Sequence, residues 1–261
     1  MIDRNHKIAF FIDIDGTLIA DSFKIPEKNI FAIEKARKDG HKVFINTGRS
    51  RGNIPPKLFE QTQFDGVLSG NGTVIEMGGE VIEKHFLEKQ TMLDFARLCF
   101  ECDNLWAVFE GFSRSYAIPG RNRGLSDIEI PVSSFDEFFT LAQADDFQVT
   151  AIGKNTNEKI NEFIDKHFTY FEFKNYYDIA PAGCNKADTM LKAAEITGIP
   201  QSNCVAIGDS GNDYEMLKKA GTGVAVSNAQ EKVLKCAEMI TLSNAEGGVG
   251  EAIFKIISER Y

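Results

Sequence analysis

Two aspartates separated by a single residue, Asp13 and Asp15, have the spacing in this chain that is best suited to chemistry. The apolar residues at 10–12 predict the end of a buried strand, and Gly16 predicts the turn that follows it. Because side chains alternate along a strand, both carboxylates would point the same way. Two neighbouring carboxylates repel each other unless a cation or a shared proton relieves them. The pair therefore predicts a site that combines a metal, a nucleophile and an acid–base group.

Polar and charged groups recur at the ends of further predicted elements, in an order that suits the same site. They are Thr47 after the apolar strand 43–46, Lys186 at the start of a helix predicted to reach 197, and Asp209 and Asp213 after the buried strand 204–208. An open α/β sheet binds ligands at the carboxyl ends of its strands. A hydroxyl, an ammonium and two more carboxylates are therefore expected beside the aspartate pair.

In these segments the chain resembles the haloacid-dehalogenase-like (HAD) phosphatases, and among them the Cof-type sugar-phosphate phosphatases. The matching segments are Asp13-Ile14-Asp15-Gly16-Thr17-Leu18, Thr47-Gly48-Arg49, Lys186 and Gly208-Asp209-Ser210-Gly211-Asn212-Asp213. The subfamily is also matched by the loop Ser69-Gly70-Asn71-Gly72, the tail segment 223–229, Ser243-Asn244 and Gly248-Val249. The resemblance covers both ends of the chain well and the middle poorly.

Two of these segments depart from the family's usual pattern. The chain has Gly183-Cys184-Asn185-Lys186-Ala187 where the family commonly has Gly-Val-Ser-Lys-Gly, and Val226-Ser227-Asn228-Ala229 where it often has Met-Gly-Asn-Ala. Alanine in place of glycine at 187 would alter the approach to a phosphate, although Asn185 is a good helix N-cap. Neither departure removes a catalytic group.

The resemblance implies a phosphatase that works through an aspartyl-phosphate. Asp13 would be the nucleophile, and Asp15 would protonate the leaving alkoxide and then take a proton from the attacking water. Lys186 would neutralise the phosphoryl oxygens, and Thr47 would donate a hydrogen bond to them. The spacing of the two aspartates alone does not decide which of them is the nucleophile.

The resemblance also implies a bound Mg²⁺, since several negative groups that meet a phosphate need a hard cation. Oxygen ligands would come from Asp13, Asp209 and the backbone carbonyl of Asp15, and Asp213 would hold a metal-bound water. The residues expected to bind the phosphate or the rest of the substrate are Gly16, Gly48, Arg49, Asn71 and Asn212.

The composition is that of an acidic globular protein of 261 residues with a formal net charge of −9. This charge argues against non-specific binding to nucleic acid or to an anionic membrane, but not against a phosphorylated ligand. No apolar stretch approaches the roughly 18 residues of a membrane span. The five cysteines are odd in number and no signal peptide precedes them, so we expect reduced thiols. We therefore expect a cytoplasmic protein, monomeric or a small homo-oligomer, whose partner is a small phosphorylated metabolite and neither nucleic acid nor a membrane.

Strands and helices alternate in the first and last thirds of the chain, which predicts a parallel sheet with helices on both faces. We assign residues 1–82 and 182–261 to this α/β, Rossmann-like core domain. A hairpin is expected within it, with strands at 73–77 and 80–82 around the Gly78-Gly79 turn.

The middle of the chain, residues 83–181, has a different order of predicted elements. It reads as αββ, αβ and αββ, which predicts an α+β insert with a partly antiparallel sheet. An insert of about 100 residues is large enough to be a domain. The resemblance implies that it is the cap over the active site and sets the substrate.

Three alternatives to a phosphatase remain open at this stage. A receiver domain also combines acidic residues with a hydroxyl and a lysine, but needs only about 120 residues and no insert. A non-catalytic phospholigand-binding module can share the fold, although it would be expected to lack Asp13 or Asp15. A phosphomutase would use the same aspartyl-phosphate and is separated from a phosphatase by its product. In the insert, Arg114, Arg121 and Arg123 either face an anionic substrate or form a solvated basic loop.

Overall fold

The computed structural model describes residues 7–20, 23–120 and 123–259, which form two compact units. The first unit holds the described residues up to Thr47, then Pro55–Glu83, and the chain from Asn185 onward. The second unit holds Lys84–Cys184 together with the short segment Gly48–Ile54. The chain therefore passes between the units four times, whereas a single insert at 83–181 would need two passages. No periodicity in the sequence distinguishes Gly48–Ile54 from the core residues on either side of it.

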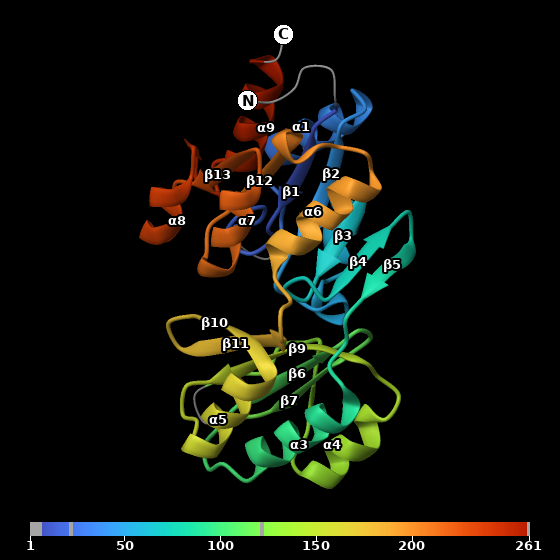
Figure 1. Ribbon diagram of the computed structural model, residues 1–261, viewed down its shortest axis with the longest axis vertical. Helices are drawn as coiled ribbons and strands as arrows, with labels where there is room; N and C mark the ends of the chain where they lie inside the picture. Colours follow the sequence, from blue (N-terminus) through green and yellow to red (C-terminus); the bar gives the residue numbers. More distant parts are fainter. Residues whose placement is uncertain (1–6, 21–22, 121–122, 260–261) are drawn as a thin grey trace. The chain divides into compact units, whose positions relative to one another are not determined.

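The first unit is built on an eight-stranded sheet whose order is β14-β13-β12-β1-β2-β3-β4-β5 (Figure 1). Its strands are β1 Ala9–Ile12, β2 Lys42–Asn46, β3 Gly66–Ser69, β4 Val74–Met77, β5 Glu80–Lys84, β12 Cys204–Gly208, β13 Thr222–Val226 and β14 Met239–Thr241. All pairs from β14 to β3 are parallel, and β4 runs antiparallel to β3. The central strands β1 and β12 are buried along their whole length, as expected for parallel strands covered on both faces.

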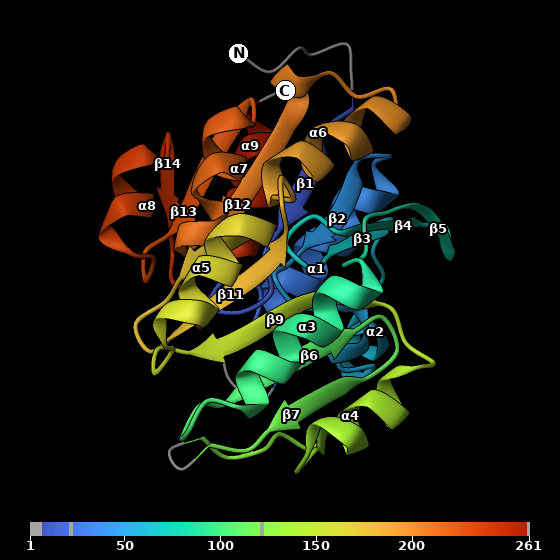
Figure 2. The same ribbon diagram turned by 60° about the horizontal axis from the view of Figure 1, so that its bottom comes forward.

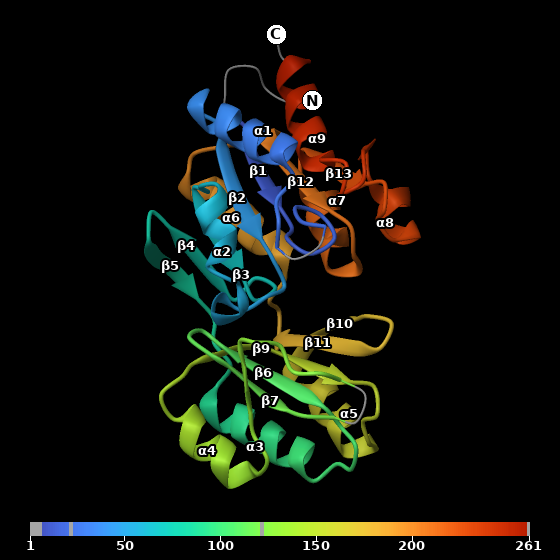
Figure 3. The ribbon, with the colours of Figure 1, turned by 180° about the vertical axis from the view of Figure 1, so that it is seen from behind.

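Helices cover both faces of this sheet. They are α1 Glu27–Lys38, α2 Lys57–Gln61, α6 Lys186–Ile196, α7 Tyr214–Lys219, α8 Glu231–Cys236 and α9 Gly248–Ser258. Helices α6 and α7 lie on the face turned to the viewer in Figure 1, and α1 and α9 lie side by side on the opposite face, seen in Figure 3. The predicted fold class is confirmed. The helix α2 was not predicted, because its five residues are too few to show a helical period.

The second unit contains a six-stranded sheet in the order β10-β11-β9-β6-β7-β8. Its four central strands, β11, β9, β6 and β7, are labelled in Figure 2. Its strands are β6 Ala107–Gly111, β7 Ser115–Ile118, β8 Glu129–Pro131, β9 Phe147–Gly153, β10 Phe168–Glu172 and β11 Tyr176–Pro181. Its helices are α3 Lys89–Phe100, α4 Phe135–Ala142 and α5 Glu158–His167. The pairs are antiparallel except for β7 with β8, a three-residue strand that the sequence did not predict.

Phenylalanine rings form much of the core of the second unit. Phe138 lies at its centre, with ring centroids 4.7 Å from Phe109 and 5.8 Å from Phe147. Phe95 of α3 packs against Phe109 and Phe168. These contacts join the helices to the sheet and give this unit a hydrophobic core of its own.

Within the described part of the chain, no helix is long and apolar enough to cross a membrane.

Candidate active site

Asp13 is the first residue after β1, at the carboxyl end of the central strand of the first unit. Its backbone N–H donates to the Ile207 carbonyl of β12 at 3.0 Å, so the sheet register extends to the aspartate itself. The chain then turns back, and the N–H of Leu18 donates to the Asp13 carbonyl at 3.1 Å. Only 4% of Asp13 is exposed. The sheet and the turn together fix this carboxylate in a buried position.

Lys186, the first residue of α6, places its ammonium between two carboxylates. Its Nζ lies 2.6 Å from Asp13 Oδ1 and 2.7 Å from Asp213 Oδ1. Burial opposes the charged form, but the two carboxylates outweigh it and raise the pKa of Lys186 above its ordinary value. The helix begins here because the Asn185 side chain accepts the N–H of Asp188 at 2.9 Å. The two carboxylates therefore favour the charged form of the buried lysine.

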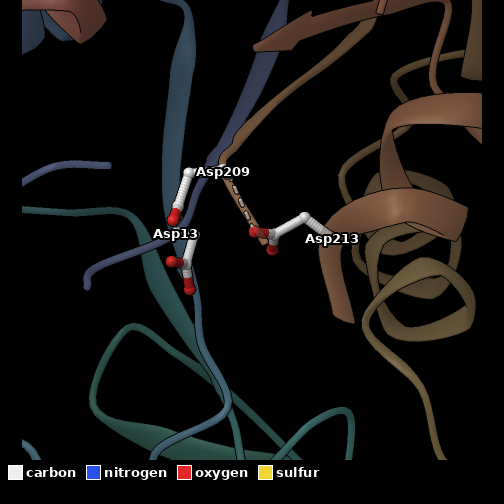
Figure 4. Close-up of side chains that lie close together, drawn as sticks. All are labelled: Asp13, Asp209 and Asp213. Atoms are coloured by element: carbon white, nitrogen blue, oxygen red, sulfur yellow. Dashed lines mark hydrogen bonds between the residues drawn. The ribbon is translucent and has the colours of Figure 1, made fainter. Parts of the chain in front are cut away.

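The acidic loop after β12 is organised around the Asp213 carboxylate. Asp213 Oδ2 accepts the backbone N–H groups of Asp209 and Ser210, both at 3.0 Å, while Oδ1 accepts from Lys186. Asp213 is fully buried. Figure 4 shows its side chain beside those of Asp13 and Asp209. Both oxygens of Asp213 already bind protein donors, which suits a group that holds a metal-bound water better than a direct ligand.

Asp209 is positioned by the turn that follows the aspartate pair. The Thr17 hydroxyl donates to Asp209 Oδ1 at 2.8 Å. Gly16 has a φ of +79°, and a Cβ there would lie 2.6 Å from Asp209 Oδ2. A glycine is thus required at 16 both by its backbone conformation and by the approach of Asp209. We assigned no role to Thr17 from the sequence, because a threonine in a turn after a strand is common.

The buried Asp13 and Asp213, the partly buried Asp209 and the lysine form an arrangement with an excess of negative charge. Asp13, Asp209 and Asp213 each offer an oxygen within 4.8 Å of the others. Burial, followed by repulsion from neighbouring carboxylates, raises the pKa of Asp13 well above its ordinary value even though Lys186 opposes the shift. Burial and then Asp213 raise the pKa of Asp209 to about 7. With all three carboxylates ionised the cluster would carry two net negative charges, which a divalent cation would balance.

Asp15 does not belong to this buried cluster. Strand β1 ends at Ile12, so the alternation that we used to orient the aspartate pair does not extend to Asp15. Asp15 lies on the turn instead, and it is exposed. It therefore differs from Asp13 in burial, as a nucleophile and an acid–base group in one site would be expected to differ.

Thr47, Asn71 and Asn212 are brought together beside the acidic loop. Thr47 is buried at the end of β2, and its carbonyl accepts the N–H of Asn71 at 3.1 Å. The Asn71 side-chain oxygen accepts from Asn212 Nδ2 at 2.9 Å. The tight turn around Asn71 packs against the start of α6, since a Cβ on Gly72 would lie 2.2 Å from the Asn185 carbonyl oxygen. These expected site residues thus share one end of the sheet with Lys186.

Gly48 and Arg49 group with the second unit instead. The N–H of Ser50 donates to Glu110 Oε2 at 3.1 Å, and the N–H of Arg51 donates to Gln148 Oε1 at 2.7 Å. Burial raises the pKa of Glu110, while the charge of Arg49 opposes the shift. The segment that carries Arg49 is therefore anchored to β6 and β9 of the second unit.

The arginines singled out in the insert have separate environments. Arg123 forms a bidentate ion pair with Glu129 and lies 4.9 Å above the Trp106 ring, which favours a structural role. The backbone N–H of Arg114 donates to Asp145 Oδ2 at 2.9 Å, which fixes the turn on which Arg114 lies. Arg121 lies outside the described residues.

Known proteins with the same motifs extend over nearly the whole chain. The model of the haloacid dehalogenase-like hydrolase family matches residues 10–253. The 5-amino-6-(5-phospho-D-ribitylamino)uracil phosphatase YcsE of Bacillus subtilis (strain 168) is 31% identical, over 93% of this chain and 92% of its own. Phosphatase YwpJ of the same strain is 27% identical, over 91% of this chain and 95% of its own. Among solved structures, the HAD subclass IIB sugar phosphatase BT4131 has a TM-score of 0.80 and 26% identity, covering 96% of this chain and 99% of that one. The family expected from the motifs is thereby confirmed: the chain belongs to the haloacid dehalogenase-like hydrolases and is a phosphatase of that family.

Proposed function

We propose that the protein hydrolyses the phosphate monoester of a small metabolite, a sugar phosphate or a similar compound, with Mg²⁺ and through an aspartyl-phosphate on Asp13. The observation that carries the proposal is the buried contact of Lys186 with both Asp13 and Asp213, at 2.6 and 2.7 Å. A fixed cation next to a buried carboxylate suits the transfer of a dianionic phosphoryl group, where catalysis depends on positioning and charge neutralisation.

The proposed reaction has two displacements. In the first, an Asp13 oxygen forms a bond to phosphorus, the bond to the leaving oxygen breaks, and the Asp15 carboxyl gives its proton to that oxygen. In the second, a water gives a proton to Asp15 and forms a bond to phosphorus, and the bond to Asp13 breaks. Lys186 holds the phosphoryl oxygens in both steps, and Thr47 donates a hydrogen bond to them.

The residues present suit a Mg²⁺ ion. Asp13, Asp209 and the backbone carbonyl of Asp15 would supply hard oxygen ligands, and Asp213 would bind a metal-coordinated water. When bound, the ion would neutralise charge on the phosphoryl group and on the carboxylates around it. Gly16 leaves room for Asp209 next to the turn, and its N–H is suited to a phosphoryl oxygen, as are the side chains of Asn71 and of Asn212 in the acidic loop.

Mg²⁺ is expected to stabilise the protein more at about pH 8 than at about pH 5. The folded-state pKa of Asp209 is raised from 3.8 to about 7, so ionising this carboxyl group lowers the free energy of unfolding. The loss is absent below the ordinary pKa of 3.8 and grows as the pH rises from there to about 7. A bound cation offsets this loss. Thermal unfolding with Mg²⁺ and with EDTA, at matched ionic strength, measures the difference. Equal Mg²⁺-induced shifts at the two pH values would contradict the proposed ligand set.

The substrate is proposed to be read by residues 83–181 acting as a cap domain, together with the Arg49 segment anchored to the same unit. YcsE acts on a phosphorylated ribitylaminouracil and BT4131 is a sugar phosphatase. A panel of phosphosugars, nucleotides and phosphorylated cofactors is therefore the direct experiment, with release of inorganic phosphate as the readout and EDTA as the control. Isomerised phosphosugar without free phosphate would identify a phosphomutase instead. The proposal includes a cytoplasmic location, a monomer or small homo-oligomer, and no nucleic-acid or membrane partner, in keeping with the net charge of −9.

A further inference from the structure

Three asparagines hold the turn that follows the aspartate pair, one from the next helix, α1, and two from the C-terminal part of the chain. Their side-chain amides donate to three carbonyls of that turn: Asn228 to Gly16 at 2.9 Å, Asn29 to Leu18 at 3.2 Å and Asn244 to Ile19 at 2.9 Å. We call Asn29, Asn228 and Asn244 the asparagine clamp. Asn228 and Asn244 lie in the tail segments that resemble the Cof-type subfamily but have no part in the proposed chemistry so far.

The orientation of each clamp amide is fixed by a second hydrogen bond. Each side-chain oxygen accepts a backbone N–H: Asn29 from Gly250 at 2.7 Å, Asn228 from Asn244 at 2.8 Å and Asn244 from Ala245 at 2.9 Å. Because only the oxygen of the side-chain amide can accept a hydrogen bond from a backbone N–H, the amide nitrogen must face the turn. Asn228 and Asn244 are moreover connected to each other, so they act on the turn as a pair.

Other polar groups of the turn also form hydrogen bonds. The N–H groups of Leu18 and Ile19 donate to the Ile14 carbonyl at 3.0 and 3.1 Å, and the Thr17 hydroxyl donates to Asp209. The clamp therefore adds hydrogen bonds to the carbonyl groups of a turn whose N–H groups are already bonded within the turn. Asp15 lies on this turn, so a displacement of the turn backbone would displace its carboxyl group.

We propose that the asparagine clamp consists of positioning residues, which hold the turn so that the Asp15 carboxyl meets the leaving oxygen of the substrate. This inference rests on the proposed function, in which Asp15 is the proton donor. A general acid must lie within hydrogen-bond reach of its acceptor, and a small displacement removes much of its effect. Loss of the clamp should therefore harm the esters that need a proton most.

The variants Asn228→Asp and Asn244→Asp test the clamp with little change of shape. Each keeps the oxygen that accepts a backbone N–H, but replaces the amide donor by a carboxylate oxygen that faces a carbonyl. Asn228 is exposed and Asn244 half-buried, so both variants should fold. Asn29 is buried, and a carboxylate at that position would be expected to disturb folding, so Asn29 is left unchanged. Ser227→Asp is the matched control, because it adds the same charge at the neighbouring exposed position and removes no donor to the turn.

The measurement is the leaving-group dependence of kcat/KM with 2,4-dinitrophenyl, p-nitrophenyl and phenyl phosphate. In the two clamp variants, and more strongly in the double variant, kcat/KM for phenyl phosphate should fall about tenfold relative to 2,4-dinitrophenyl phosphate, a part of the 10²–10⁴-fold typical of a general acid. Asp15→Asn should show the same trend with a larger effect, and Ser227→Asp should match the unmodified protein. Amide hydrogen exchange in residues 13–20 should accelerate in the clamp variants alone.

Three results would overturn the inference, and they can be told apart. If Asp15→Asn steepens the leaving-group dependence but the double clamp variant does not, the clamp has no positioning role and the proposed function stands. If Asp15→Asn leaves the dependence unchanged, Asp15 is not the proton donor, and the proposed function fails together with the inference. An equal slowing of all three esters by the clamp variants would mark the asparagines as structural and would also overturn it.

Discussion

Replacing Asp13 with asparagine is expected to reduce turnover of p-nitrophenyl phosphate by at least about 10⁴-fold, close to background. Asparagine keeps the shape of the side chain but cannot form the bond to phosphorus. The protein should remain folded, because burial raises the pKa of Asp13 and the neutral amide removes a charge from an acidic cluster. Release of p-nitrophenol and thermal unfolding measure the two effects separately.

The control for this variant is Asp39→Asn, which removes another lysine-paired aspartate from the same unit. Asp39 pairs with Lys35 at the end of α1, away from the sheet end that carries the site. Its loss should leave turnover within about twofold, since surface ion pairs contribute little. Appreciable steady-state activity in Asp13→Asn would remove Asp13 from the role of nucleophile.

Replacing Lys186 with methionine is expected to have the second largest effect, on both activity and stability. The side chain is 1% exposed and is the cation that faces Asp13 and Asp213, so its loss leaves two buried carboxylates uncompensated. Removing one partner of a buried ion pair typically costs about 3–5 kcal/mol. The loss should be greater at about pH 8 than at about pH 5, because burial raises the pKa of Asp13 and its protonation at the lower pH removes one of the two charges. Turnover should fall by roughly 10³-fold, because the phosphoryl oxygens lose their fixed cation.

The matched control is Lys192→Met in the same helix. Lys192 pairs with Glu195 at 3.0 Å and its side chain is 47% exposed. Its loss should leave both the free energy of unfolding and turnover nearly unaltered, because an exposed ion pair contributes little. Denaturant unfolding and phosphate release compare the two lysines. Similar losses of stability and turnover in both variants would mean that they do not arise from the burial of Lys186 between two carboxylates.

The elements that position the candidate site could be predicted because their sequences are strongly patterned. Strands β1 and β12 are continuous apolar runs followed directly by aspartates, and an N-cap asparagine stands directly before Lys186 at the start of α6. Where such elements end decides which polar groups meet at one end of a parallel sheet. The order of the elements was therefore enough to predict that Asp13, Lys186 and Asp209 lie close together.

Other features could not be predicted, because they depend on contacts between residues far apart in the sequence. The bond from Thr17 to Asp209 spans 192 residues and that from Asn228 to Gly16 spans 212. The segment Gly48–Ile54 looks like a core loop in sequence, yet it groups with the second unit through bonds to Glu110 and Gln148. Strand β8 has three residues and one apolar side chain, which is too little pattern to identify it.

The most direct test of the central claim is to trap the phosphoryl group on Asp13. The Asp15→Asn variant should react with 2,4-dinitrophenyl phosphate, whose leaving group needs no proton, and should then release phosphate slowly because no base activates the water. After an acid quench, mass spectrometry should find one added phosphoryl group on the peptide that contains Asp13, and hydroxylamine should remove it. The double variant Asp13→Asn with Asp15→Asn should carry none. A variant that releases dinitrophenol without any covalent phosphoryl group, or with the group on another residue, would contradict the account.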